Sequence, residues 1–153
     1  MDRPYNLLFL CTGNSARSIL AEALANQLAK SRFRAYSAGS QPRGRVHPMA
    51  LQVLDEAGIA TDGLRSKPWD EFATPDAPPM DLIITVCDKA AGEACPLWPG
   101  HPVTAHWGIE DPASVAGSQE QVHKAFGKAL QLLQHRLSLL MALKPEALDR
   151  LAL

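Results

Sequence analysis

The sequence predicts a single α/β domain, a three-layer α/β/α arrangement in which helices cover both faces of a mostly parallel sheet. Two runs, residues 6–10 and 81–86, are continuously apolar rather than alternating, which is typical of strands buried on both faces of a parallel sheet. Segments with helical spacing lie between and after these runs, and this alternation favours the α/β class. The chain has 153 residues, the size of one ordinary domain, so we expect residues 1–153 to form one unit.

Each further element follows from local pattern, in chain order. Leu20, Leu24 and Leu28 recur at helical spacing with alanines between them, and a second helix is expected over residues 49–54, after Pro48 at its first position. Shorter strands are expected over residues 34–37 and 103–107. The C-terminal segment predicts a long amphipathic helix, because its apolar residues fall at steps of three and four: Val122, Phe126, Leu130, Leu133, Leu137 and Leu140.

The composition excludes several classes of protein. Hydrophobic residues make up 46% and charged residues 20%, and the net charge is -1, which argues against disorder and against a broad nucleic-acid-binding surface. The apolar stretch at residues 7–10 lacks a preceding basic region and a cleavage site, and residues 137–143 fall far short of the roughly 20 needed to cross a bilayer. We therefore expect a cytoplasmic protein with neither a nucleic-acid nor a membrane partner.

The loop after the first strand carries the strongest functional signal. Residues 11–18 read Cys-Thr-Gly-Asn-Ser-Ala-Arg-Ser, and a helical pattern opens at once behind them. A strand, a loop of small residues and a helix N-terminus form a socket for a tetrahedral oxyanion, with Arg17 as a planar fork for two oxygens. Arg17 and the helix terminus should lower the pKa of the Cys11 thiol below its reference of about 8.5. Ser18 is placed to donate to the sulfur.

Within this loop, the candidate oxyanion-binding residues share small size or polarity and are Thr12, Gly13, Asn14, Ser15, Ala16, Arg17 and Ser18. Asn14 suits a left-handed backbone position. The plainer alternative is a buried strand-end cysteine, a surface arginine and a serine helix cap, all common states. A nucleotide loop of the Gly-Lys-Ser type is excluded, since no lysine follows the glycine.

Residues 11–18, together with Ser37-Ala-Gly39 and Asp111-Pro112, resemble the low-molecular-weight protein tyrosine phosphatase fold over essentially the whole chain, and most of all the bacterial arsenate reductases that share it. The resemblance implies a central four-stranded parallel sheet in flavodoxin-like order. It also implies Cys11 as the nucleophile, Arg17 with the loop amides as the anion clamp, Asp111 as the general acid, and Ser37 as a support for the loop through Asn14.

The other two of the three cysteines have a different setting. Cys87 directly follows the second buried strand, and Cys95 comes eight residues later. Adjacent parallel strands end on the same side of a sheet, so Cys87 is expected near Cys11, and a relay of thiols supplies the two electrons that a reductase needs. The alternatives are packing cysteines, or half of a zinc site completed by His101 and His106, although that spacing matches no closed zinc pattern. No metal is therefore predicted.

Asp111 follows the last strand, at the same edge of the sheet, but Asp before Pro is also a common helix cap. Only the resemblance favours the acid. Phosphatases of this fold usually place tyrosines after the Asp-Pro pair, whereas Ala113 and Ser114 stand here, which weakens recognition of a phosphotyrosine ring. Some reductases of the family bind potassium through an aspartate, but the stretch here reads Ser66-Lys67-Pro68, so the ion is not predicted.

The leading hypothesis is reduction of arsenate to arsenite by Cys11, Cys87 and Cys95 in turn, for arsenic detoxification. Phosphate or sulfate would compete as oxyanions. No tightly bound cofactor is expected, only an external thiol reductant: thioredoxin is favoured by the resemblance, and glutaredoxin or glutathione remains open. The alternatives are a phosphatase acting on phosphotyrosine or small phosphomonoesters through the same loop, and a non-catalytic oxyanion or redox sensor.

Overall fold

The computed structural model describes residues 4–29, 32–86, 103–115 and 117–142. Its centre is a four-stranded sheet in the order β2-β1-β3-β4, and all three strand pairings are parallel. The strands are β1 (Tyr5–Cys11), β2 (Phe33–Gly39), β3 (Leu82–Thr85) and β4 (Val103–His106). The predicted α/β class and flavodoxin-like strand order are confirmed.

The two central strands are buried on both faces, as their continuous apolar runs predicted. Four successive residues of β1, from Leu7 to Leu10, are at most 1% exposed, and the β3 residues Leu82, Ile83 and Ile84 are at most 2% exposed. Side chains of a strand alternate between faces, so burial of every residue in a row requires cover on both sides of the sheet.

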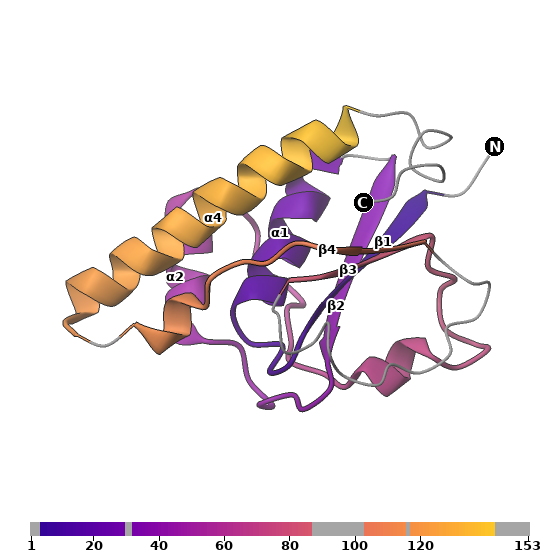
Figure 1. Cartoon of the computed structure of the whole chain (residues 1–153), viewed down its shortest axis with the longest axis horizontal. Coiled ribbons are helices and arrows are strands. Elements are labelled where there is room, and N and C mark those ends of the chain that lie inside the picture. The colour runs from indigo at the N-terminus through magenta and orange to yellow at the C-terminus, as the bar shows by residue number, and fades with distance from the viewer. Residues whose placement is uncertain (1–3, 30–31, 87–102, 116, 143–153) are drawn as a thin grey trace.

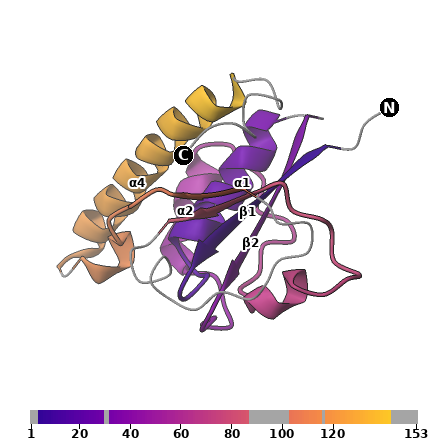
Figure 2. The same ribbon diagram turned by 45° about the vertical axis from the view of Figure 1, so that its right-hand side comes forward.

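That cover differs between the two faces (Figure 1, Figure 2). One face packs under the three α-helices of the described residues, and its core joins Phe9 of β1 to Leu20, Val53 and Leu133. These helices are α1 (Arg17–Ala29), α2 (Pro48–Glu56) and α4 (Gln119–Met141). The opposite face packs Leu8 and Leu10 against a smaller cluster that includes Phe72 of the 3₁₀ helix η1 (Trp69–Phe72). The sequence pattern did not predict η1.

The helices begin where capping chemistry allows. Pro48 occupies the first turn of α2, as predicted, and the preceding His47 accepts a hydrogen bond from the Met49 N–H through Nδ1 at 3.0 Å. Ser118 and Gln121 form a reciprocal capping box at the start of α4. The C-terminal amphipathic pattern is confirmed, because the buried residues of α4 include Phe126, Leu130, Leu133, Leu137 and Leu140. None of the helices in the described ranges is long and apolar enough to span a bilayer.

Strand β2 is longer than the predicted residues 34–37, and its extra length shapes the site. It continues to Gly39, which pairs with Cys11. A Cβ atom at Gly39 would lie 2.5 Å from the Thr12 carbonyl oxygen and 2.7 Å from that of Cys11. Only glycine lets the two chains run this close. The carboxyl ends of all four strands therefore meet at one edge, where Cys11 lies.

Candidate active site

Cys11 is the last residue of β1 and is 5% exposed. It forms no disulfide with any other residue of the described ranges. Residues 12–16 turn the chain, and α1 begins at Arg17. Asn14 has φ of 44°, the left-handed conformation that the sequence predicted for it. The thiol thus stands beside the amino end of a thirteen-residue helix, where backbone N–H groups attract an anion.

Arg17 is held in place by the loop that follows β4. Its Nη1 donates to the Ile109 carbonyl oxygen at 2.8 Å, and its Nη2 lies 3.6 Å from Asp111 Oδ2. The Arg17 Nε is buried and has no hydrogen-bond partner among the described residues. Buried donors are nearly always satisfied. A donor of this kind, on a guanidinium fixed by the loop after β4, fits an oxyanion.

Asp111 makes the capping contact and also faces the Arg17 guanidinium. Its Oδ1 accepts from the Ala113 N–H at 2.9 Å and so caps the 3₁₀ helix η2 (Pro112–Ser114), while Oδ2 faces Arg17. The side chain is 33% exposed. Capping needs only one carboxyl oxygen, which leaves the other near the anion clamp. The capping contact is therefore present, and the acid role stays a prediction.

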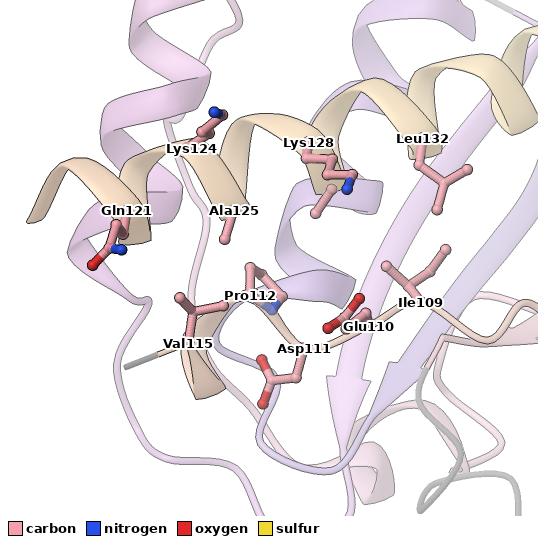
Figure 3. Close-up of a pocket in the computed structure, with 11 residues that line it drawn as sticks. Ile109, Glu110, Asp111, Pro112, Val115, Gln121, Lys124, Ala125, Lys128 and Leu132 are labelled. Carbon is pink, nitrogen blue, oxygen red and sulfur yellow. The ribbon is translucent and has the colours of Figure 1, made fainter. Parts of the chain in front are cut away.

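Asp111 also borders a cavity of about 440 Å³ between the loop after β4 and helix α4 (Figure 3). Apolar side chains such as Ile109, Val115 and Leu132 line it, with Lys124 and Lys128 on the α4 side. The loop of residues 11–18, here called the Cys11 loop, contributes no residue to the lining of this cavity. The cavity is therefore distinct from the oxyanion socket, although the two share Asp111.

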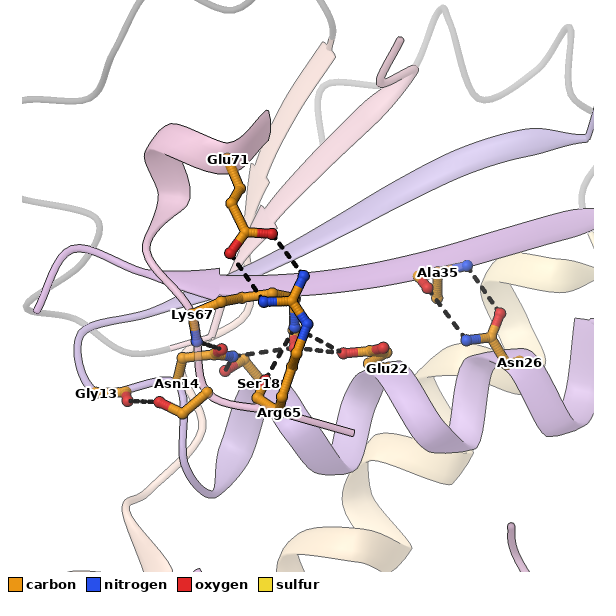
Figure 4. A network of polar contacts seen from close by, with 11 residues as sticks. Gly13, Asn14, Ser18, Glu22, Asn26, Ala35, Arg65, Lys67 and Glu71 are labelled. Atoms are coloured by element: carbon orange, nitrogen blue, oxygen red, sulfur yellow. Dashed lines mark hydrogen bonds and ion pairs between the residues drawn. The ribbon is translucent and has the colours of Figure 1, made fainter. Parts of the chain in front are cut away.

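The inner side of the Cys11 loop rests on a buried polar network (Figure 4). The Asn14 amide donates to Ser18 Oγ at 2.8 Å and to Ser37 Oγ at 2.9 Å, and its oxygen accepts from the Lys67 N–H at 2.9 Å. The hydrogen bond between Asn14 and Ser37 that the resemblance implied is thus present. Ser18 Oγ accepts from Asn14, so its own proton remains to be donated elsewhere. One side chain ties the loop to α1, β2 and the segment before η1.

Glu22 and Lys67 continue this network below the loop. Glu22 accepts from Ser37 Oγ and lies 3.7 Å from Lys67 Nζ, which also donates to the Arg65 carbonyl oxygen at 2.9 Å. Burial raises the pKa of Glu22, although Lys67 and Ser37 oppose the shift. Burial likewise lowers the pKa of Lys67 against the opposing charge of Glu22.

The position of the Lys67 ammonium also disfavours a bound potassium ion, which the sequence did not predict. It places one of the protein's own positive charges beside the Glu22 carboxylate. A further cation at that carboxylate would be repelled, so the side chains present do not fit a potassium site there. Within the described ranges, no group of three or more His, Cys, Asp or Glu side chains gathers as metal ligands do.

The structure brings Cys11, Arg17 and Asp111 to one edge of the sheet, with the loop residues between them. Cys87, Cys95 and His101 lie outside the described residues. Sequence reasoning missed Glu22 and Lys67. Glu22 carried a weak signal, since it is one helical turn beyond Ser18 on a helix whose neighbouring residues are apolar.

Comparison with known proteins agrees with the fold and the loop. The family model described as low molecular weight phosphotyrosine protein phosphatase matches residues 6–151. An arsenate reductase of Bacillus subtilis (strain 168) is 36% identical over 131 residues, which cover 86% of this chain and 91% of that protein.

Two solved structures are also similar. One is an arsenate reductase in the phosphate binding state, 29% identical with a TM-score of 0.73, covering 90% of this chain and 97% of the other. The second is a thioredoxin-dependent arsenate reductase of Corynebacterium glutamicum, 27% identical with a TM-score of 0.59, covering 90% of this chain and 64% of that one. Strand order, the Cys11 loop and the match over residues 6–151 lead to one conclusion: the chain belongs to the low molecular weight phosphotyrosine protein phosphatase family.

Proposed function

We propose that this protein is an arsenate reductase that uses Cys11 as its nucleophile and draws electrons from an external thiol. The observation that carries the proposal is the Arg17 guanidinium, which the loop after β4 holds near the strand ends where Cys11 lies, with its buried Nε donor and with Asp111 at 3.6 Å. A nucleophile, an anion clamp and an acid are what attack on a tetrahedral oxyanion requires. The arsenate reductases among its relatives support arsenate as that oxyanion.

In the first step, the Cys11 thiolate attacks arsenic and an As–O bond breaks. Arg17 and the loop N–H groups stabilise the negative charge on the remaining oxygens. Asp111, when protonated, gives its proton to the leaving hydroxide, which departs as water. The product is a thioester of As(V) on Cys11, and no electrons have yet been transferred.

The second and third steps transfer two electrons. Cys87 attacks the Cys11 sulfur, the S–As bond breaks with its electron pair moving to arsenic, and arsenite leaves as a Cys11–Cys87 disulfide forms. Cys95 then attacks Cys87, which releases the Cys11 thiolate and leaves a Cys87–Cys95 disulfide. The supporting observation is positional, since Cys87 follows β3 and the end of β3 lies beside the end of β1.

The remaining oxidised pair needs an external dithiol. Thioredoxin is our proposed donor, supported by the thioredoxin-dependent relative from Corynebacterium glutamicum. Glutaredoxin with glutathione is the alternative, and no tightly bound cofactor is required for either route. This chemistry suits the reducing cytoplasm, where dithiol donors are kept reduced.

The test is arsenate-dependent NADPH consumption by the purified protein, run in parallel with a thioredoxin system and with a glutathione and glutaredoxin system. We expect sustained turnover in the thioredoxin assay and its complete loss in Cys11→Ser. Cys87→Ser and Cys95→Ser should each abolish multiple turnover. Silence of the wild-type protein with both donor systems contradicts the proposal.

The same preparation separates the phosphatase alternative. Hydrolysis of an aryl phosphate that exceeds arsenate turnover in kcat/KM, and that survives in Cys87→Ser and Cys95→Ser, would favour a phosphatase. We expect only weak hydrolysis, because Ala113 replaces an aromatic side chain beside Asp111 and its N–H is engaged by that carboxylate. A small residue there offers little surface for a ring.

A further inference from the structure

A second loop, at residues 41–47 after β2, is fastened to the Cys11 loop through the backbone. The N–H groups of Gln41, Arg43 and His47 donate to the carbonyl oxygens of Thr12, Gly13 and Ser15, each at 2.9 Å. These three bonds are spread along both loops and hold them together. Any side chain of residues 41–47 is consequently positioned relative to the oxyanion socket.

Arg43 uses this placement to lie across the Cys11 loop. A Cβ atom at Gly13 would stand 3.0 Å from Arg43 Nε and 3.3 Å from Arg43 Cγ. The absence of a side chain at Gly13 is what lets the Arg43 stem pack on the loop backbone. Ser66 reinforces the arrangement, since its hydroxyl donates to the Gly13 carbonyl at 3.1 Å and accepts from the Gly44 N–H at 3.2 Å.

The positive charges of this loop have no ionic partner among the described residues. Arg43 and Arg45 are both exposed, and neither guanidinium makes an ion pair or hydrogen bond with a residue in the described part of the chain. Arg65, by contrast, is committed to Glu71. No acidic residue occurs in residues 40–47. Arg43, which lies against Gly13, and its neighbour Arg45 therefore form an arginine rim beside the socket, unpaired within the described ranges.

The charges of Arg43 and Arg45 also affect the pKa of a neighbouring residue, His47. The pKa of His47 is lowered, first by burial and next by the charge of Arg43, with a smaller effect of Arg45, while Asp111 on the other side opposes the shift. The pKa of His47 therefore depends both on Arg43 and Arg45 and on Asp111, the residue that faces Arg17. The rim and the anion clamp share one electrostatic neighbourhood.

We propose that Arg43, assisted by Arg45, forms a cationic entrance that captures the tetrahedral oxyanion and raises its affinity for the Cys11 loop. The inference deepens the proposed function, because the oxyanion is then the substrate. Unpaired charges beside a site raise the local concentration of an oppositely charged ligand, and salt screens this effect. Arg43 acts on binding, so it should affect KM and leave kcat unchanged.

The test measures binding without turnover. Iodoacetamide alkylates Cys11, inorganic phosphate protects it, and the phosphate concentration for half protection reports affinity. To isolate Cys11, the assay uses a background with Cys87 and Cys95 replaced by serine. Half protection is a ratio of rates at one pH, so a change in intrinsic thiol reactivity does not alter it.

We expect Arg43→Gln to require roughly fivefold more phosphate than the parent at low ionic strength, and Arg43→Gln with Arg45→Gln to require more still. At about 0.5 M salt the difference should shrink towards none. Arg43→Lys should recover most of the affinity, because it restores the charge. Arg34→Gln, the same change at an exposed residue of β2 towards the opposite end of the strand, is the matched control and should behave as the parent.

Two results would overturn the inference: an unchanged half-protection concentration in the double arginine variant at low ionic strength, or a loss that salt does not reduce. Circular dichroism and thermal unfolding establish that each variant is folded. The proposed function fails separately. Phosphate that protects Cys11 in a protein unable to reduce arsenate would leave the entrance intact and remove the reductase, whereas no protection of the parent would remove the socket itself.

Discussion

The two sides of the Cys11 loop are built in opposite ways. On the inner side, Asn14 and Ser37 are fully buried, and both side-chain polar atoms of Asn14 are hydrogen-bonded to neighbours. On the outer side, Arg43 and Arg45 are exposed, with no ionic partner in the described ranges.

This difference means that the inner side determines the conformation of the loop, whereas the outer side affects its affinity for an anion. A buried network with every partner in place determines the loop conformation, because breaking any bond leaves a polar group without water. Exposed charges contribute little to the stability of the fold, and their electrostatic attraction can act on a ligand instead. Substitutions on the inner side should therefore cost stability first, while those on the outer side should cost binding first. Five predictions test the comparison; four concern stability and are ordered by their expected effect on unfolding, and one concerns the titration of His47.

The largest effect is expected for Lys67→Met. Lys67 is 5% exposed and faces Glu22, so the substitution strands a buried carboxylate. We expect the free energy of unfolding at neutral pH to fall by about 3–5 kcal/mol, measured by urea denaturation. Adding Glu22→Gln to Lys67→Met should recover a large part of that loss. If the loss in the double variant equals the sum of the losses in Lys67→Met and Glu22→Gln alone, the pair is not coupled.

Asn14→Ala should cost somewhat less, about 2–3 kcal/mol, since three hydrogen bonds within a buried network are lost. Asn14→Gly loses the same bonds but accepts φ of 44° without strain, so it should be more stable than Asn14→Ala by about 1 kcal/mol. Equal stabilities of the two variants would remove backbone conformation from the explanation. Denaturant unfolding measures both.

His47 gives a pH-dependent effect of about 1 kcal/mol. Its Nδ1 caps α2 by accepting from Met49, which requires the neutral ring. The pKa of His47 is lowered in the folded protein, so its stabilising contribution is present above the ordinary value of 6.5 and is lost as pH falls through the lowered pKa. The stability of wild type relative to His47→Asn should therefore decline from about pH 8 to about pH 5.

The same histidine reports on the rim. Arg43→Gln removes a charge that lowers the pKa of His47, so the pKa measured by NMR titration should rise. An unchanged titration would place Arg43 too far from the socket to act on an anion there.

The smallest effect on stability is expected for Arg65→Gln. Arg65 pairs with Glu71 through both Nη atoms, but its side chain is 60% exposed. We expect a loss of at most about 1 kcal/mol, reduced further by salt. This pair is the exposed counterpart of Glu22 and Lys67, and a loss as large as that of Lys67→Met would contradict the distinction between buried and exposed charges.

Much of the fold followed from local pattern. Continuous apolar runs predicted strands β1 and β3, and the helical spacing of apolar residues predicted α4. Each of these patterns is long enough to stand out from chance. The longer β2 was only partly predicted. Its last residues are Ser37, Ala38 and Gly39, which carry weak strand preference and are extended by pairing with β1.

The site was predictable only where its residues are neighbours in the chain. Cys11 and Arg17 lie in one strand, loop and helix unit, so their spacing carried the signal. Lys67 joins Glu22 across 45 residues, and nothing in the Ser66-Lys67-Pro68 stretch predicts that its ammonium is buried. Arg43 likewise looks like an ordinary surface arginine in the sequence, and only the structure shows that its side chain lies against Gly13.

By itself, the sequence determined the α/β class, the order of most elements and the loop that follows Cys11 at a strand end, since these depend on interactions within short segments. The tertiary structure decided the rest: the Glu22–Lys67 pair, the split of the Asp111 carboxyl between Ala113 and Arg17, and the Arg43 rim. Such contacts depend on strand register and on how two loops pair through their backbones. Hydrogen bonds of that kind use atoms that every residue has, so side-chain pattern does not reveal them.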